Sequence, residues 1–187
     1  MTNDLKCITV FGSGTIGTEN PLYQTAYELG FLLGKAGFTH VSGGYGGTME
    51  AGAKGARDAG AKTIGITVES WGPPNPYIIE CRSMPNLFRR LEQLMKIGQG
   101  YIVLPGATGT LLEFALAWER INKHIDRPKP IVLLGDFWLP VVDFIKRQIP
   151  DSRPADVSHP DCLFGGFLWH EPTPEKTVHR IISRILP

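Results

Sequence analysis

Residues Tyr101–Glu113 read YIVLPGATGTLLE and place a strand, a glycine turn and the start of a helix in immediate succession. The apolar run 101–104 is typical of a buried parallel strand. Apolar periodicity resumes near Thr110, which predicts a helix from about that residue to Lys123. Strand, turn and helix form the repeating unit of folds with a parallel sheet, so this stretch indicates an α/β protein.

The turn within this stretch has the features of an anion-binding site. Gly106 and Gly109 lack a Cβ, so a phosphate can approach the backbone closely. The helix start presents free N–H groups and the positive end of its dipole. Glu113 follows in the first helical turn, and an acid beside a phosphate turn suggests nucleotide chemistry. Thr110 and Glu113 also match a capping box, and both interpretations are open at this point.

The same succession recurs along the whole chain. We expect strands at residues 6–11, 38–41, 62–68, 77–81, 101–104, 130–134 and 167–170, the last at an edge of the sheet. We expect helices at residues 21–36, 48–59, 86–97, 110–123, 138–148 and 173–185, with Asn20 and Thr48 as N-caps, and a loop at 150–160. This alternation predicts a doubly wound, mostly parallel, Rossmann-like sheet with helices on both faces, in a single domain covering residues 1–187.

Two further glycine turns follow the first two expected strands. Residues 42–47 read SGGYGG, and their glycines exceed what a plain turn needs, which favours a ligand role for Gly43, Gly44, Gly46 and Gly47. The shorter turn Gly12-Ser13-Gly14 is a weaker candidate for a phosphate or ribose contact. Neither turn has the spacing of a dinucleotide fingerprint or a P-loop. Because ligands bind at the carboxyl ends of parallel strands, one pocket can use both of the longer turns.

Arg89 and Arg90 lie early in the helix expected at 86–97. Neighbouring helical residues point about 100° apart, so one of the two is expected to face the pocket. The alternative is a solvated arginine that pairs with Glu92 on the surface. The five histidines show no metal-ligand spacing, although His40 ends a strand beside a turn. No metal and no cofactor are expected, and the four tryptophans are expected in the core or at an interface rather than as stacking surfaces for a ligand.

Composition limits the classes of partner. The chain has 187 residues, 42% hydrophobic and 20% charged, which suits one globular domain. A net charge of +1 gives no general attraction to nucleic acid or to an anionic membrane, so anion binding must be local. No apolar run is long enough to cross a bilayer, residues 1–4 do not resemble a signal peptide, and the three cysteines are scattered. We therefore expect a cytoplasmic protein.

The glycine turns and the upstream arginine resemble the LOG ("lonely guy") family, the cytokinin riboside 5′-monophosphate phosphoribohydrolases. The family pattern Pro-Gly-Gly-x-Gly-Thr-x-x-Glu stands at residues 105–113, and its upstream Gly-Gly-Gly-x-x-Gly-x-Met stands at 42–49. The resemblance extends from Ile8 to the last helix. Ser42 and Ala107 replace glycines of the two patterns, and Leu91, Leu94 and Leu112 replace a lysine, a methionine and an acid of cytokinin-activating members. These differences concern the choice of base more than the fold.

The resemblance implies roles for particular residues. Arg90 and Glu113 correspond to the family's catalytic pair, and the residues that would hold the 5′-phosphate are Gly106, Thr108, Gly109 and Thr110. It also implies a homodimer with a base pocket near the subunit interface. Many relatives carry the label "possible lysine decarboxylase", but no lysine of this chain stands out as a Schiff-base residue.

Two functions are consistent with these residues. The first is hydrolysis of the N-glycosidic bond of a nucleoside 5′-monophosphate to free base and ribose 5-phosphate, through an oxocarbenium-like transition state that Glu113 faces. Arg90 would hold the phosphate or the ribose, or polarise the leaving base. The second is a non-catalytic nucleotide-binding protein or a molybdenum-cofactor carrier that uses the same turns, with Glu113 acting only as a cap.

Overall fold

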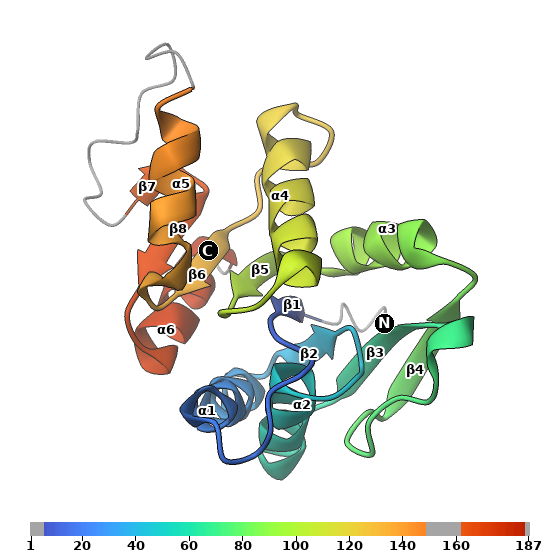
Figure 1. The fold of residues 1–187 in the computed structure, drawn as a ribbon. Helices are drawn as coiled ribbons and strands as arrows, with labels where there is room; N and C mark the ends of the chain where they lie inside the picture. Colours follow the sequence, from blue (N-terminus) through green and yellow to red (C-terminus); the bar gives the residue numbers. More distant parts are fainter. Residues whose placement is uncertain (1–5, 149–161, 186–187) are drawn as a thin grey trace, which may run out of the picture.

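The computed structural model describes residues 6–148 and 162–185, which form an eight-stranded sheet with helices on both faces (Figure 1). The strands are β1 (Cys7–Phe11), β2 (Thr39–Ser42), β3 (Thr63–Val68), β4 (Glu80–Met84), β5 (Gly100–Val103), β6 (Ile131–Leu134), β7 (Cys162–Phe164) and β8 (Leu168–Glu171). The helices are α1 (Pro21–Lys35), α2 (Thr48–Asp58), α3 (Leu87–Ile97), α4 (Thr108–Asn122), α5 (Leu139–Lys146) and α6 (Pro174–Ile185), with short 3₁₀ turns η1 (Glu69–Trp71) and η2 (Asp136–Trp138).

The strand order is β4-β3-β2-β1-β5-β6-β8-β7. Every neighbouring pair is parallel except β7 and β8, which are antiparallel. Sequential strands run outward from β1 in one direction up to β4, and the chain then returns to the other side of β1 through β5. This is a doubly wound Rossmann-like α/β fold, which confirms the predicted fold class.

The two faces of the sheet bury separate hydrophobic clusters. Helices α3, α4 and α5 cover one face, drawn above the sheet in Figure 1, and α1, α2 and α6 cover the other. On the first face, Phe114, Trp118 and Trp138 pack on strand residues such as Tyr101. On the second face, Leu29 and other residues of α1 pack on the alternate strand positions together with Trp169. Burial of both faces explains the continuous apolar strands of the sequence.

Most of the expected elements are confirmed, and α1 begins at its predicted cap residue. The side chain of Asn20 accepts a hydrogen bond from the Leu22 amide at 2.9 Å, and Pro21 occupies the first turn of α1. Asn86 caps α3 in the same way, through the Arg89 amide at 3.0 Å. The asparagine side chains satisfy helix donors that would otherwise lack partners.

Several expectations at the ends of elements are wrong. The strand expected at 167–170 is β8, which lies between β6 and β7 rather than at an edge. The edge strand is β7, whose three residues are too few to give a recognisable pattern. Thr48 does not cap α2; it is the first helical residue, and its hydroxyl donates to the Ser13 carbonyl at 3.1 Å. The loop expected at 150–160 lies outside the described residues. Among the described residues, no helix has the length and apolarity to cross a bilayer.

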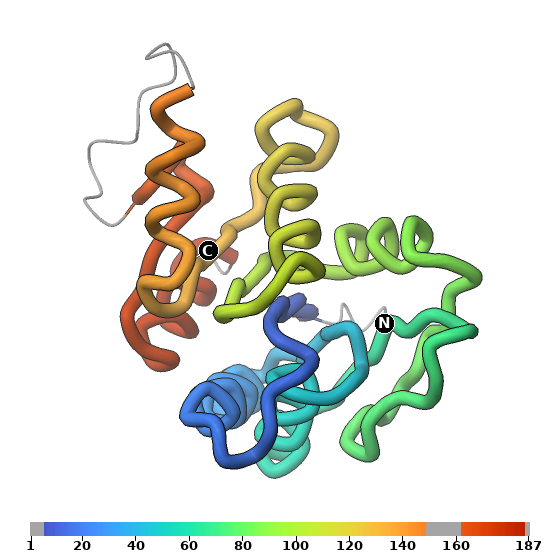
Figure 2. Tube along the Cα trace, viewed as in Figure 1, coloured from blue at the N-terminus to red at the C-terminus, as the bar shows by residue number. Residues whose placement is uncertain are grey.

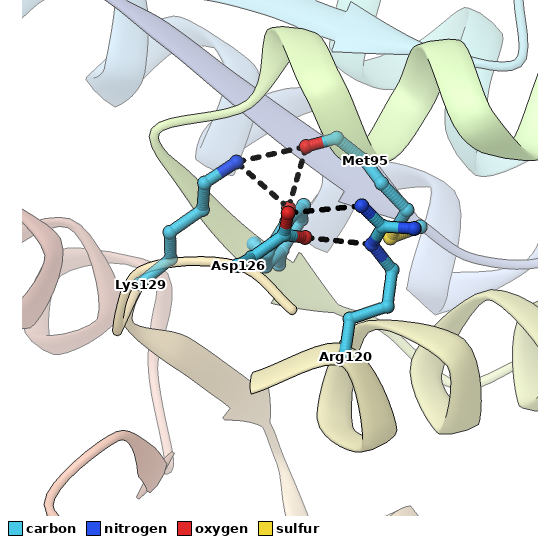
Figure 3. Close-up of polar contacts among 5 residues, drawn as sticks. Met95, Arg120, Asp126 and Lys129 are labelled. Carbon is cyan, nitrogen blue, oxygen red and sulfur yellow. Dashed lines mark hydrogen bonds and ion pairs between the residues drawn. The ribbon is translucent and has the colours of Figure 1, made fainter. Parts of the chain in front are cut away.

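Two sets of polar contacts lie near the far ends of α3 and α4, at the amino ends of the strands (Figure 3). The Lys129 ammonium donates to the Met95 carbonyl at 2.8 Å and to the Tyr101 hydroxyl at 3.2 Å, and that hydroxyl donates to the same carbonyl at 2.7 Å. Arg120 of α4 binds both carboxylate oxygens of Asp126 at 2.7 and 2.9 Å. The first set ties Lys129 and β5 to the end of α3, and the second ties the end of α4 to the loop that follows it. Helices α3 and α4 supply the site described below.

The buried His40 is expected to destabilise the folded protein at acid pH. It is fully buried on β2 against Gly52, and neither ring nitrogen has a hydrogen-bond partner among the described residues. Burial lowers the pKa of His40 from 6.5 to about 4. The unfolded chain therefore binds a proton below pH 6.5 that the folded protein does not bind until about pH 4. We expect the free energy of unfolding to fall by up to about 3 kcal/mol across this interval on account of His40.

The measurement is urea unfolding at pH 7.5, 5.5 and 4.5, for the unmodified protein and for His40→Leu. Other groups also titrate in this range, so the test is the difference between the two proteins. The variant should lose less stability on acidification, by about 2–3 kcal/mol. If the free energy of unfolding fell equally with pH in both proteins, the pKa of His40 would not be lowered by folding, and the prediction would be wrong.

Candidate functional site

The site lies where the winding direction of the sheet reverses. The connection after β1 leads to α1 on one face, and the connection after β5 leads to α4 on the other. Because β1 and β5 are neighbours, a crevice opens between the two connections at the carboxyl ends of the strands. Figure 2 shows the blue trace after β1 beside the yellow-green trace that enters α4.

The three glycine turns meet at this crevice. The Ser13 amide donates to the Pro105 carbonyl at 3.2 Å, and the Thr48 amide donates to the Ser13 carbonyl at 2.8 Å. Gly47 has a φ of 64°, and a Cβ there would collide with the same Ser13 carbonyl. The turn at 12–14, the weakest of the three in the sequence, therefore lies between the other two and joins them.

Helix α4 begins at Thr108, two residues earlier than expected, with Ala107 as its N-cap and no side-chain cap hydrogen bond. The backbone amides of the first helical turn, at residues 108–110, have no carbonyl partner within the helix. The capping-box interpretation is wrong, because Glu113 lies in the second turn and its carboxylate points to Arg90. Gly106 has to be glycine, since a Cβ there would collide with the Thr110 side chain.

Arg90 and Glu113 form a buried ion pair. Nη1 of Arg90 lies 3.0 Å from Oε1 of Glu113, and the side chains are only 7% and 9% exposed. The Arg90 Nε also donates to the Ile66 carbonyl at 2.9 Å, near the end of β3. Arg89 instead lies on the surface, 65% exposed, and pairs with Glu92 at 2.7 Å. Arg90, which the family resemblance assigned to the catalytic pair, is therefore the arginine that turns inward.

The Glu113 carboxyl is held in an environment that perturbs its proton affinity. Burial raises the pKa of Glu113, and the neighbouring Arg90 charge opposes that shift. A carboxyl group with a raised pKa, paired with one cation and placed at a cleft, is a frequent feature of catalytic sites. Such a group can stabilise a developing positive charge or accept a proton from water.

The ion pair and the start of α4 border one cleft of about 410 Å³, within the size range of small-molecule sites. Of the predicted site residues, those that line it are Gly12, Ser13, Arg90, Thr108, Gly109, Thr110 and Glu113. Those that do not line it are Gly43, Gly44, Gly46, Gly47 and Gly106. Among the described residues, no group of three histidine, cysteine or acidic side chains is arranged to hold a metal.

The glycines of the turn at 42–47 do not line the cleft, and Gly43 makes room for Arg90 instead. Nη2 of Arg90 lies so close to Gly43 that a Cβ on Gly43 would collide with it. Gly44 has a φ of 79° and packs on Gly65 of β3. The Asn75 side chain donates to the carbonyls of Gly44 at 3.1 Å and Tyr45 at 2.8 Å. The hydrogen bonds from Asn75 hold the turn in place, and the missing Cβ of Gly43 leaves room for the Arg90 guanidinium.

Sequence reasoning missed the aromatic side of the cleft. Trp71 and Tyr45 both line it, as does Met49. The four tryptophans were expected in the core or at an interface; three are buried and Trp71 is not. No spacing rule singles out Trp71, because it sits in a one-turn 3₁₀ segment after β3. Two of the family departures, Leu91 and Leu112, also border the cleft, whereas Leu94 lies in the core.

The sheet order and the position of the cleft define a Rossmann-like α/β protein. Within that class, the family model described as "Possible lysine decarboxylase" matches residues 49–156. The chain belongs to this family, the LOG family, which confirms the resemblance of its motifs.

Two relatives and one solved structure illustrate the similarity. The cytokinin riboside 5′-monophosphate phosphoribohydrolase of Rhodococcoides fascians is 29% identical over 151 residues, covering 76% of this chain and 75% of that protein. The pyrimidine/purine nucleotide 5′-monophosphate nucleosidase of Escherichia coli K12 is 32% identical over 164 residues, 78% of this chain but only 35% of that longer protein. The structure of the molybdenum cofactor binding protein of Rippkaea orientalis superposes with a TM-score of 0.72, at 25% identity, over 96% of each chain.

Proposed function

We propose that this protein hydrolyses the N-glycosidic bond of nucleoside 5′-monophosphates and releases a free base and ribose 5-phosphate. The observation that carries the proposal is the buried Arg90–Glu113 pair, 3.0 Å apart, bordering the same cleft as the uncapped start of α4. The names of the relatives support it, since both are described as acting on nucleoside or nucleotide 5′-monophosphates.

The phosphate would bind at the start of α4. The free amides at residues 108–110 and the helix dipole favour a dianion there, and the adjoining turn at 12–14 closes the other side. Binding through main-chain amides anchors the sugar without a metal ion. This anchoring converts phosphate-binding energy into correct placement of the reacting bond.

Glu113 would act on the ribose rather than on the phosphate, since two anions repel each other. As the bond to the base lengthens, the sugar gains positive charge, and the ionised carboxylate stabilises it. Water then adds to the anomeric carbon and gives up a proton, while the base leaves with the bonding electrons and takes a proton. The Arg90 charge favours the ionised form of the buried carboxylate, against the effect of burial, and its hydrogen bond holds the carboxylate in place.

A panel of monophosphates tests the proposal. Purified protein is incubated with AMP, GMP, CMP, UMP and isopentenyladenosine 5′-monophosphate, and products are separated by chromatography. We expect free base and ribose 5-phosphate in equal amounts, and little cleavage of the matching nucleosides, which lack the anchoring phosphate. The prenylated substrate tests the narrower proposal of cytokinin activation.

A carrier function is the second candidate, favoured by the fold match to a molybdenum cofactor binding protein over 96% of each chain. A carrier would use the same amides to hold a phosphorylated pterin and would need no reacting acid. Absence of cleavage across the panel, together with a rise in melting temperature on adding a phosphorylated ligand, would favour the carrier.

We also propose that the protein is a homodimer that associates through the face formed by α4 and α5. Leu111 and Leu112 of α4 and Phe144 of α5 are exposed, and exposed apolar groups of this kind favour association. Light scattering should give twice the 20.6 kDa chain mass, and Phe144→Glu should shift the mass toward one chain. Ile79→Glu, an equivalent change before β4, should leave the mass unchanged. A monomeric unmodified protein would rule the dimer out.

A further inference from the structure

Trp71 differs from the other tryptophans of the chain. Trp118, Trp138 and Trp169 are buried in the two cores, whereas Trp71 is 52% exposed. It ends the 3₁₀ turn η1, directly after β3, and borders the cleft that contains the ion pair. An accessible indole at this cleft is not needed for the packing of either core.

Neighbouring groups hold this indole in place. The Tyr45 hydroxyl accepts a hydrogen bond from the Val68 amide at 2.8 Å, which ties the glycine turn to the segment that carries Trp71. The Tyr45 and Trp71 rings lie 6.1 Å apart, and Cζ of Arg90 lies 5.7 Å from the Trp71 ring centre. The ring is therefore oriented from two sides and still leaves about half of its surface open.

We propose that Trp71 is the surface on which the nucleobase stacks. The inference rests on the proposed function, which requires a base in this cleft. The ends of β3 and β5 are three strand spacings apart, or about 14 Å. Trp71 follows the first of these strands and the phosphate site follows the second, so the two lie at opposite ends of the cleft.

Arg90 connects the β3 side of the cleft to the α4 side. Its Nε is anchored at Ile66 of β3 and its Nη1 reaches Glu113 on α4. A nucleotide with its phosphate at α4 and its base on Trp71 places the ribose, and thus the bond to be broken, beside this pair. A two-ring purine overlaps an indole more fully than a pyrimidine does, so stacking on Trp71 favours purine nucleotides.

Binding measurements on two replacements test the assignment. Glu113→Gln serves as the background, so that ligands bind without turnover, and Trp71→Leu and Trp71→Phe are added to it. Calorimetric titrations use AMP and ribose 5-phosphate, which differ by the base. Trp71→Leu should weaken AMP binding about 5- to 100-fold, the usual effect of losing one base–aromatic stack, and change ribose 5-phosphate binding less than twofold. Trp71→Phe should retain most of the AMP affinity.

Phe137 offers a matched control. It is 54% exposed in the 3₁₀ turn η2 after β6, yet it does not border the cleft. Phe137→Leu should leave both affinities unchanged. Equal weakening of both ligands by Trp71→Leu would show that Trp71 only supports Arg90 and would overturn the proposal, as would unchanged AMP affinity or no AMP binding to the background protein.

The test separates the two proposals. Base-dependent loss of affinity in Trp71→Leu, without cleavage of any monophosphate by the unmodified protein, supports the stacking role and contradicts the hydrolase. Cleavage of AMP with a KM that Trp71→Leu does not change supports the hydrolase and contradicts the stacking role.

Discussion

Glu113→Gln is expected to slow the release of base by about 10²- to 10⁴-fold while the protein stays folded. The glutamine amide has no charge to stabilise an oxocarbenium ion and is a poor proton acceptor. Its carbonyl oxygen can still accept the hydrogen bond that Arg90 Nη1 donates to the carboxylate at 3.0 Å. The neighbouring cation is thus not left without a hydrogen-bond partner, and we expect a loss of stability of about 1–3 kcal/mol. Chromatographic assay of base release and thermal unfolding measure the two effects separately.

The control makes the same chemical change in the neighbouring surface pair. Glu92 bonds Arg89 at 2.7 Å, but both side chains are more than half exposed. Glu92→Gln should leave the rate within about twofold, since exposed pairs contribute little energy. A Glu113→Gln protein with nearly full activity would remove the acid from the mechanism.

Gly43→Ala is expected to reduce kcat/KM by about 10²-fold, although the residue does not line the cleft. The new methyl group would occupy the place of Arg90 Nη2 and would also crowd Met49 Sδ, 2.8 Å from the Cβ position. The guanidinium would have to leave its bonds to the Ile66 carbonyl and Glu113. The acid would then lose its partner, and the substrate would lose the geometry that the pair provides.

Gly17→Ala is the matched control for this substitution. Nothing lies within 4 Å of a Cβ at Gly17, so the same methyl group enters open space. Steady-state kinetics and urea unfolding of both variants distinguish a displaced arginine from a damaged fold. Unchanged kinetics in Gly43→Ala would mean that the reaction does not depend on where Arg90 sits.

Local sequence signals were sufficient to predict most of the fold. The apolar strand runs, the asparagine cap at Asn20 and the glycine turns all arise from neighbouring residues, and the structure confirms the elements they mark. The start of α4 was misplaced because Thr110 matches a local capping pattern, while the helix begins two residues earlier and directs Glu113 toward α3.

Long-range contacts were beyond the reach of sequence reasoning. The position of β8 depends on pairing with the short strand β7, which has no pattern of its own. The role of Gly43 depends on a guanidinium 47 positions later in the chain, and that of Trp71 on a turn without periodicity. Such contacts appear only when distant segments are brought together.

The three turns that meet around Ser13 are joined by backbone hydrogen bonds, whereas the other end of the cleft is lined by side chains. The proposed phosphate site consists of peptide groups whose positions follow from chain geometry, so replacements such as Ala107 leave it in place. In the proposed binding mode, a few side chains at the opposite end, Trp71 and Leu91 among them, would distinguish one ligand from another. Such a scaffold can acquire a new ligand preference by point mutation without rebuilding its anchor.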